Sequence, residues 1–203
     1  MGRRSDPQQI RSKQIIRATI RCLARGGFSQ LTMKRLATEA GVSQGVLHYY
    51  FKDKQAILAA AADHVMNDLD LRVATEAATA RDAKTRLRAI IRACLSVAMD
   101  DREFWTVFMA LWGETLHDAK LASLNRATYR RARRAIADVI EQGIREGQFR
   151  RVDVTETSAM VLAVVDGVSL QLTFERRLMR AAPAEQLCSD LLLGYLSREH
   201  HAE

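Results

Sequence analysis

The chain has 203 residues and a formal net charge of +7, a length that allows one extended helical domain or a small head on a larger body. Its strongest apolar run, Met160 to Val165, is too short to span a bilayer, and no apolar signal segment follows the charged N-terminus, so neither membrane insertion nor secretion is expected. The three cysteines are widely spaced and form no C-x-x-C pair, which indicates reduced thiols in a cytoplasmic protein and excludes a disulfide framework.

The excess of positive charge lies entirely in the first quarter of the chain. Residues 1–54 contain eleven lysines and arginines against three acidic residues, Asp6, Glu39 and Asp53, which gives +8, whereas the remaining residues carry −1. This asymmetry is typical of proteins that bind the phosphate backbone of nucleic acids. A solvated basic face that only aids solubility has the same asymmetry, so charge alone leaves both interpretations open.

Four helices are predicted in the first 80 residues. Residues 8–25 show apolar positions at helical spacing, and a short second helix begins after the N-cap Thr32 and ends at Gly41. A third helix begins after the N-cap Ser43, and Asp53 caps a long fourth one that ends at about residue 80. A glycine turn between two short helices, followed by a long helix, is typical of a helix-turn-helix.

The rest of the chain is predicted to be helical as well, because helix-forming residues dominate and alternating β-branched runs are scarce. The further helices are expected at about 83–100, 102–113, 118–146, 154–175 and 183–197. The sequence therefore predicts an all-α fold of about nine helices. A three-helix DNA-binding head, residues 1–54, would precede a helical bundle for ligand binding and dimerisation, residues 55–203.

The predicted third helix, Ser43–Tyr50, has the residue types that a recognition helix needs. Gln44 can pair with adenine, Gly45 permits a close approach to DNA, and Val46 can meet a thymine methyl group. The predicted base contacts are Ser43, Gln44, Gly45 and Val46. The predicted phosphate contacts are Thr32, Lys34, His48, Tyr49 and Lys54. The same pattern also fits a small three-helix packing unit without DNA binding.

The stretch from Thr32 to Lys54, TMKRLATEAGVSQGVLHYYFKDK, closely resembles the head of TetR-type transcriptional regulators. In that family the pattern T-x-x-x-I-A-x-x-A-G-V-S-x-G-x-L-Y-x-H-F-x-x-K recurs. The chain departs from it at His48, where tyrosine is usual, and at Tyr50, where histidine is usual. A neutral imidazole is a shorter and weaker phosphate donor than a phenol. The resemblance implies a body that dimerises and holds a pocket for an inducer.

An aromatic cluster in the body is the candidate for that pocket, because aromatic faces attract ammonium groups. Its members fall at helical spacing within residues 104–112. Asp166, further along the chain, can supply the anionic partner of a cationic ligand. The candidate pocket residues are Trp105, Phe108, Trp112, Tyr129, Asp166 and Phe174. Aromatic residues also fill hydrophobic cores, so the cluster is interpreted as either pocket or core. The order of features over residues 104–174 is similar to the effector domain of BetI-type repressors, which regulate choline and betaine metabolism.

The last two predicted helices are the candidate dimer seam. A carboxylate at Asp166, inside an apolar helix, is costly unless it is paired or used by a ligand. Gly167 beside it would allow another helix to approach closely. The predicted interface residues are Val161, Gly167, Leu187, Leu191 and Tyr195.

Catalysis is not expected, because the five histidines lack metal-ligand spacing and no nucleophile, Walker or dinucleotide motif is present. No cofactor or metal is expected either. The main hypothesis is a cytoplasmic, homodimeric repressor that binds a palindromic operator and is released by an inducer such as choline or a polyamine. The alternatives are a non-specific nucleoid-type DNA-binding protein and a helical ligand-binding or scaffold protein that does not bind DNA.

Overall fold

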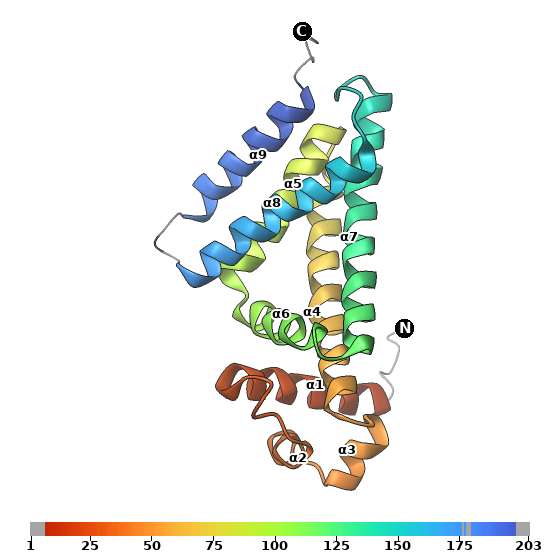
Figure 1. The fold of residues 1–203 in the computed structure, drawn as a ribbon, viewed down its shortest axis with the longest axis vertical. Coiled ribbons are helices and arrows are strands. Elements are labelled where there is room, and N and C mark those ends of the chain that lie inside the picture. The colour runs from red at the N-terminus through yellow and green to blue at the C-terminus, as the bar shows by residue number, and fades with distance from the viewer. Residues whose placement is uncertain (1–6, 176, 178–179, 198–203) are drawn as a thin grey trace. The chain divides into compact units, whose positions relative to one another are not determined.

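The computed structural model describes residues 7–175, 177 and 180–197, and this part of the chain forms nine α-helices and no β-strand (Figure 1). The all-α fold class is confirmed, and every predicted helix is present, with ends within about three residues of the predicted ones. Arg3, Arg4 and Asp6, which were counted in the charge of the head, lie outside the described residues. The helices are α1 (Pro7–Gly26), α2 (Met33–Ala40), α3 (Gln44–Tyr50), α4 (Lys54–Ala77), α5 (Ala83–Asp100), α6 (Arg102–Thr115), α7 (Ala119–Arg145), α8 (Val154–Phe174) and α9 (Ala181–Ser197).

The chain divides into two compact units. The first comprises Met1–Asn67 with Glu103–Asn125, and the second Asp68–Arg102 with Arg126–Glu203. Helices α4 and α7 therefore contribute residues to both units. The functional division at residue 54 stays a prediction. It concerns which part of the chain binds DNA, whereas the two units are defined by which residues pack together.

In the first unit α1 packs against α2, and α2 packs against α3. The apolar stripe of α1 is buried, and Leu36 of α2 and Leu47 of α3 are fully buried as well. Thr19 is the polar member of the α1 stripe, and its hydroxyl donates to the Ile15 carbonyl oxygen at 2.9 Å. That bond satisfies the buried hydroxyl within its own helix, so the core needs no second polar partner there.

In the second unit α5, α8 and α9 pack against one another around an apolar core. Arg150, in the segment between α7 and α8, holds the end of α9. Its backbone N–H donates to Leu196 O and its Nε donates to Tyr195 O, both at 2.8 Å. Its guanidinium also lies 4.2 Å from the centre of the Tyr195 ring. A positive charge on the last carbonyls of a helix is favourable, so this arginine stabilises the C-terminal end of α9.

Helix α8 has 21 residues and a mean hydropathy of 1.5 over its most apolar window, which is enough by length and composition to cross a membrane. The short run Met160 to Val165 therefore understated how apolar the whole helix is. A third of that window is buried in the protein, and Val165 and Leu172 belong to the core shared with α5 and α9. Core helices of soluble proteins have the same composition, so one such helix is only weak support for a membrane span.

Candidate DNA-binding face and effector-domain sites

The turn between α2 and α3 is built from local interactions that the sequence predicted. Thr32 caps α2 by accepting a hydrogen bond from Arg35 N at 3.2 Å, and Ser43 caps α3 by accepting one from Val46 N at 3.2 Å. Gly41 has a φ of 65° and donates its N–H to carbonyls at the end of α2. This left-handed conformation is accessible to glycine at little cost. Both caps and the turn are confirmed, and together they set the direction in which α3 leaves α2.

The four predicted base-contacting residues lie together at the start of α3 and are all exposed. Leu47, the next residue, is completely buried and anchors the helix to the rest of the unit. Val46 is 40% exposed, which is unusual for an aliphatic side chain next to a core position. The first turn of α3 therefore offers a continuous, uncharged row of short or amide side chains to an approaching partner.

The five predicted phosphate-contacting residues lie around this row, on α2, α3 and the start of α4. Thr32, Lys34, His48 and Tyr49 are exposed, and Lys54 is half-buried. The Tyr49 hydroxyl accepts a hydrogen bond from Gln8 Nε2 at 3.3 Å, and its ring packs edge-on against Tyr50. The Lys54 ammonium lies 4.4 Å from the centre of the Phe28 ring, a cation–π contact that the sequence did not indicate. Tyr49 and Lys54 are thus held by neighbouring side chains before any ligand arrives.

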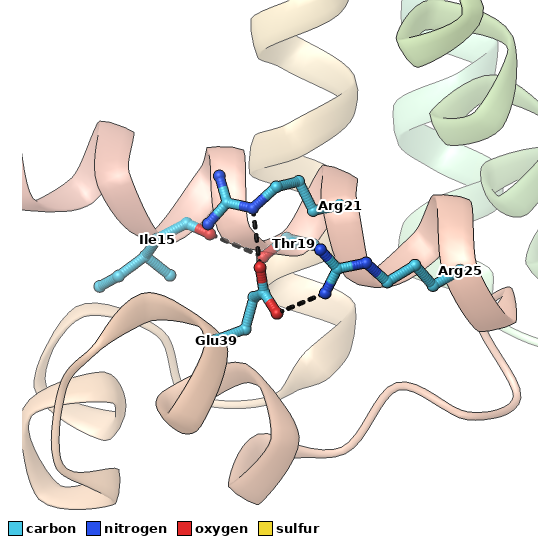
Figure 2. Close-up of polar contacts among 5 residues, drawn as sticks. All are labelled: Ile15, Thr19, Arg21, Arg25 and Glu39. Carbon is cyan, nitrogen blue, oxygen red and sulfur yellow. Dashed lines mark hydrogen bonds and ion pairs between the residues drawn. The ribbon is translucent and has the colours of Figure 1, made fainter.

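Two arginines of α1, Arg21 and Arg25, pair with Glu39 of α2 (Figure 2). Sequence analysis counted all three in the net charge of the head and assigned them no role. Their only sequence signal is the spacing of four residues between the two arginines on one helix.

The aromatic residues of α6 pack directly against one another. Neighbouring ring centres within the cluster of Phe104, Trp105, Phe108 and Trp112 lie 5.0 to 6.5 Å apart, mostly edge to face. These are the distances of aromatic packing, and Trp105 and Phe108 are each 5% exposed. The indole Nε1 of Trp105 is buried without a hydrogen-bond partner. A buried, unsatisfied donor is costly, so an acceptor placed beside this group would be stabilised.

Three other predicted pocket residues belong to the second unit. The Tyr129 hydroxyl donates to Asp166 Oδ2 at 2.8 Å, which joins α7 to α8. Burial raises the pKa of Asp166, and the hydrogen bond from Tyr129 only partly opposes that effect. Phe174, the last residue of α8, is 73% exposed. The structure therefore brings Tyr129 and Asp166 together, whereas Phe174 faces solvent.

The predicted dimer residues fall into two groups. Leu187, Leu191 and Tyr195 of α9 are each more than half exposed, and Gly167 of α8 is exposed, but Val161 is buried in the core of the second unit. Beside them a groove of about 540 Å³ runs between α8 and α9, and the segment before α8 closes it. Its lining residues are Arg150, Val152, Asp153, Glu156, Thr157, Met160, Val161, Val164, Leu191, Leu192 and Tyr195. Met160, 63% exposed, extends the same apolar surface onto α8.

No group of three or more His, Cys, Asp or Glu residues within the described ranges is close enough to hold a metal ion. All three cysteines are free thiols. Burial, reinforced by the negative charges of Asp166, Asp70 and Glu76, raises the pKa of Cys94 to about 12. A thiol with so high a pKa holds its proton at neutral pH and is a poor nucleophile or metal ligand.

Solved structures share this fold over nearly the whole chain. A putative transcriptional regulator from Pseudomonas aeruginosa is 26% identical, covers 94% of this chain and 92% of its own, and superposes with a TM-score of 0.85. A putative transcriptional regulator from Saccharomonospora viridis in complex with choline is also 26% identical, covers 93% and 98%, and has a TM-score of 0.81.

The sequence comparisons agree with the fold. The HTH-type transcriptional regulator BetI of Burkholderia thailandensis is 28% identical over 165 residues, which are 81% of this chain and 82% of that protein. Residues 15–61 match the tetR family of bacterial regulatory proteins, and residues 83–197, more than half of the chain, match the C-terminal domain of BetI-type transcriptional repressors. The chain therefore belongs to the TetR family of transcriptional regulators and carries a C-terminal domain of the BetI type.

Proposed function

We propose that this regulator is a cytoplasmic repressor that binds a palindromic operator as a homodimer and leaves it when a small cationic amine binds the effector domain. The observation that supports specific DNA binding most directly is the exposed row Ser43 to Val46 at the start of α3. Uncharged residues with short or amide side chains in that position suit contacts to base edges in the major groove.

In this proposal each subunit inserts α3 into one half-site. Gln44 and Val46 read bases, Gly45 allows the helix to come close, and Ser43 contributes a hydroxyl. The surrounding donors, Thr32, Lys34, His48, Tyr49 and Lys54, bind phosphates on either side of the groove. Phosphate contacts supply much of the affinity and make it dependent on salt, whereas base contacts supply the preference for one sequence.

The homodimer is proposed to form through α8 and α9. The support is the apolar surface of Met160, Leu187, Leu191 and Tyr195, whose side chains are each more than half exposed. Exposed apolar surface of this extent usually marks an interface. A second copy with the same surface would cover it, and two-fold symmetry would match the symmetry of a palindromic operator.

The charge of the inducer is proposed from Asp166. Its carboxyl group lies half-buried in the most apolar helix of the chain and accepts a hydrogen bond from the neutral phenol of Tyr129. An ammonium ligand would compensate the carboxylate, and a relative that is 26% identical was solved with choline. Binding would shift α4, which leads back to the head, and a coupling free energy of about 1–3 kcal/mol would release DNA.

The DNA-binding part is tested by competition. A fluorescent duplex that carries a palindrome from the region upstream of the gene is titrated with the protein, and unlabelled operator or random duplex is then added. The proposal expects the operator to compete at least about 1,000-fold better than random DNA. Equal competition would support the non-specific, nucleoid-type alternative, which shares the basic head. Absence of binding to either duplex at low salt would support a scaffold protein.

The ligand part is tested by thermal shift with choline, betaine aldehyde, spermidine and an anionic control such as citrate. A cation is expected to raise Tm in the wild type and to have little effect on Asp166→Asn. The matched control is Asp138→Asn, which removes an exposed carboxylate from α7.

A Trp112→Ala variant with unchanged ligand affinity would assign the α6 aromatics to the core. A shift with citrate alone would reject a cationic inducer.

A further inference from the structure

Glu39 lies in the last turn of α2, and two arginines of α1 converge on it (Figure 2). Arg21 Nε lies 2.7 Å from Oε1, and Arg25 Nη1 lies 2.8 Å from Oε2, so each carboxylate oxygen has its own arginine. We call these three residues the Glu39 bridge. Charge-assisted hydrogen bonds of this length are among the stronger polar contacts of a protein surface.

The carboxylate is the most covered member of the bridge. Its side chain is 21% exposed, against 46% for Arg21 and 61% for Arg25. The hydrogen bond from Arg21 and the charges of both arginines hold the pKa of Glu39 below its usual value, against the opposing effect of burial. Glu39 therefore stays ionised at neutral pH, and the bridge carries a net charge of +1 in place of the +2 of two free arginines.

The bridge does not lie on the side of α2 that carries Lys34. Glu39 is five positions after Lys34, and at 3.6 residues per turn this places their side chains roughly 140° apart around the helix. Arg21 and Arg25, four residues apart, lie on one face of α1. Without Glu39 they would form a second pair of phosphate donors, directed differently from the donors around α3.

We propose that Glu39 is a specificity-determining residue, which holds Arg21 and Arg25, halves their combined charge and so suppresses a non-specific mode of DNA binding by the head. The inference rests on the proposed function, since it assumes that α3 prefers an operator. The basic head contains only three acidic residues, and of the two that the structure describes, Glu39 and Asp53, Glu39 is the one placed between two arginines. The bridge thereby lowers the positive charge that Arg21 and Arg25 present on this part of the head.

The test measures the affinity of the full-length protein for operator and for random duplex between 50 and 200 mM salt. Glu39→Gln frees both arginines, and two added phosphate contacts would steepen the salt dependence for random duplex by about 1.8 in log–log slope. The gain in random-duplex affinity on going from 200 to 50 mM would then exceed that of the wild type by roughly tenfold. Operator affinity should stay within about threefold of the wild-type value. The ratio of operator affinity to random-duplex affinity is therefore expected to fall.

The matched control is Glu76→Gln, which removes the same charge from a glutamate–arginine pair outside the head, where Arg92 Nε lies 2.6 Å from Glu76 Oε2. It should leave the slope for random duplex unchanged. In the triple variant Arg21→Gln, Arg25→Gln, Glu39→Gln, the random-duplex affinity should fall back to the wild-type value. A Glu39→Gln variant with the slope of the Glu76→Gln control would overturn the proposal and leave the bridge a purely structural link.

A second comparison does not depend on the folding of Glu39→Gln. Arg21→Gln removes an arginine that its hydrogen bond to Glu39 already keeps from contacting phosphate, so the slope for random duplex should not change. Lys34→Gln removes a proposed phosphate contact and should lower the slope by about 0.9. Equal reductions of the random-duplex slope in Arg21→Gln and Lys34→Gln would contradict the inference about Glu39. A wild type that does not prefer the operator would instead contradict the proposed function.

Discussion

A Cβ added at Gly45 would meet the Ser43 hydroxyl oxygen at 3.8 Å and nothing closer, so the protein itself has room for alanine. Alanine also favours the helix by about 0.5–1 kcal/mol, which corresponds to a Tm roughly 1–4 °C higher. A methyl group at this exposed position would, however, collide with DNA in the major groove. We expect Gly45→Ala to raise Tm and to weaken operator binding by about tenfold or more, measured by calorimetry and fluorescence anisotropy.

The control for this prediction is Gly113→Ala in α6, where an added Cβ meets no atom within 4 Å. This variant should stabilise the protein in the same direction and leave operator affinity unchanged. Undiminished operator binding by Gly45→Ala would mean that DNA does not approach the start of α3 closely.

Asp166 makes the stability of the protein depend on pH. Burial raises the pKa of this carboxyl group above its value in the unfolded chain, so the folded state binds the proton more tightly. The ionised carboxylate therefore destabilises the fold at pH above the folded pKa, and this cost disappears as the pH falls toward the unfolded value of about 4. Asp166→Asn should have the higher Tm at neutral pH, and its advantage should shrink in acid. Parallel Tm curves for the two proteins between pH 4 and 8 would contradict this assignment.

The end of α7 depends on a glycine that packs against an aromatic ring. Gln148 N and Phe149 N both donate to Gly143 O, at 2.8 and 3.0 Å, which folds the chain back after Gly147. The Phe149 ring then covers Gly143 so closely that an added Cβ would overlap it. Phe149 is 5% exposed and belongs to the core of its unit, so it has little room to move away.

We expect Gly143→Ala to cost about 1–3 kcal/mol of unfolding free energy, because overpacking outweighs the helix propensity of alanine. Chemical denaturation measures this loss as a lower midpoint concentration of denaturant, with the m value unchanged. Gly113→Ala again serves as the control, since it makes the same change in a helix with open space and should be neutral or stabilising. A stable Gly143→Ala protein would mean that the turn at residues 147–149 rearranges at little cost.

The quaternary structure can be tested at the exposed surface of α9. Leu191 is 61% exposed and lines the groove between α8 and α9. Leu191→Glu would place two like charges in the proposed dimer seam, so sedimentation should show a monomer at concentrations where the wild type is a dimer. Loss of bivalent binding should lower operator affinity by about 100-fold or more.

The matched control is Leu116→Glu, which changes an even more exposed leucine between α6 and α7. It should affect neither the sedimentation nor the operator affinity. A Leu191→Glu protein that remains dimeric would place the subunit interface elsewhere on the molecule.

The sequence by itself determined the helices of this protein, including the short helix that carries the predicted base contacts. Thr32, Gly41 and Ser43 act through hydrogen bonds to residues at most four positions away, so their effect can be recognised without knowing the fold. The apolar spacing in α1 and the uncharged start of α3 are local patterns of the same kind. For that reason the recognition helix was predicted at Ser43–Tyr50, and the structure has it at Gln44–Tyr50 with Ser43 as its cap.

Only the tertiary structure decided which of the predicted site residues, far apart in the sequence, are in contact. Tyr129 and Asp166 are 37 positions apart and form a hydrogen bond, whereas Phe174, assigned to the same pocket, is largely exposed. Val161 and Leu191 share an apolar character, yet one is in the core and the other faces solvent. The Glu39 bridge joins α2 to arginines 14 and 18 positions earlier. Such pairings depend on how helices pack, and helix packing is fixed by the sum of many contacts and not by any pattern within one helix.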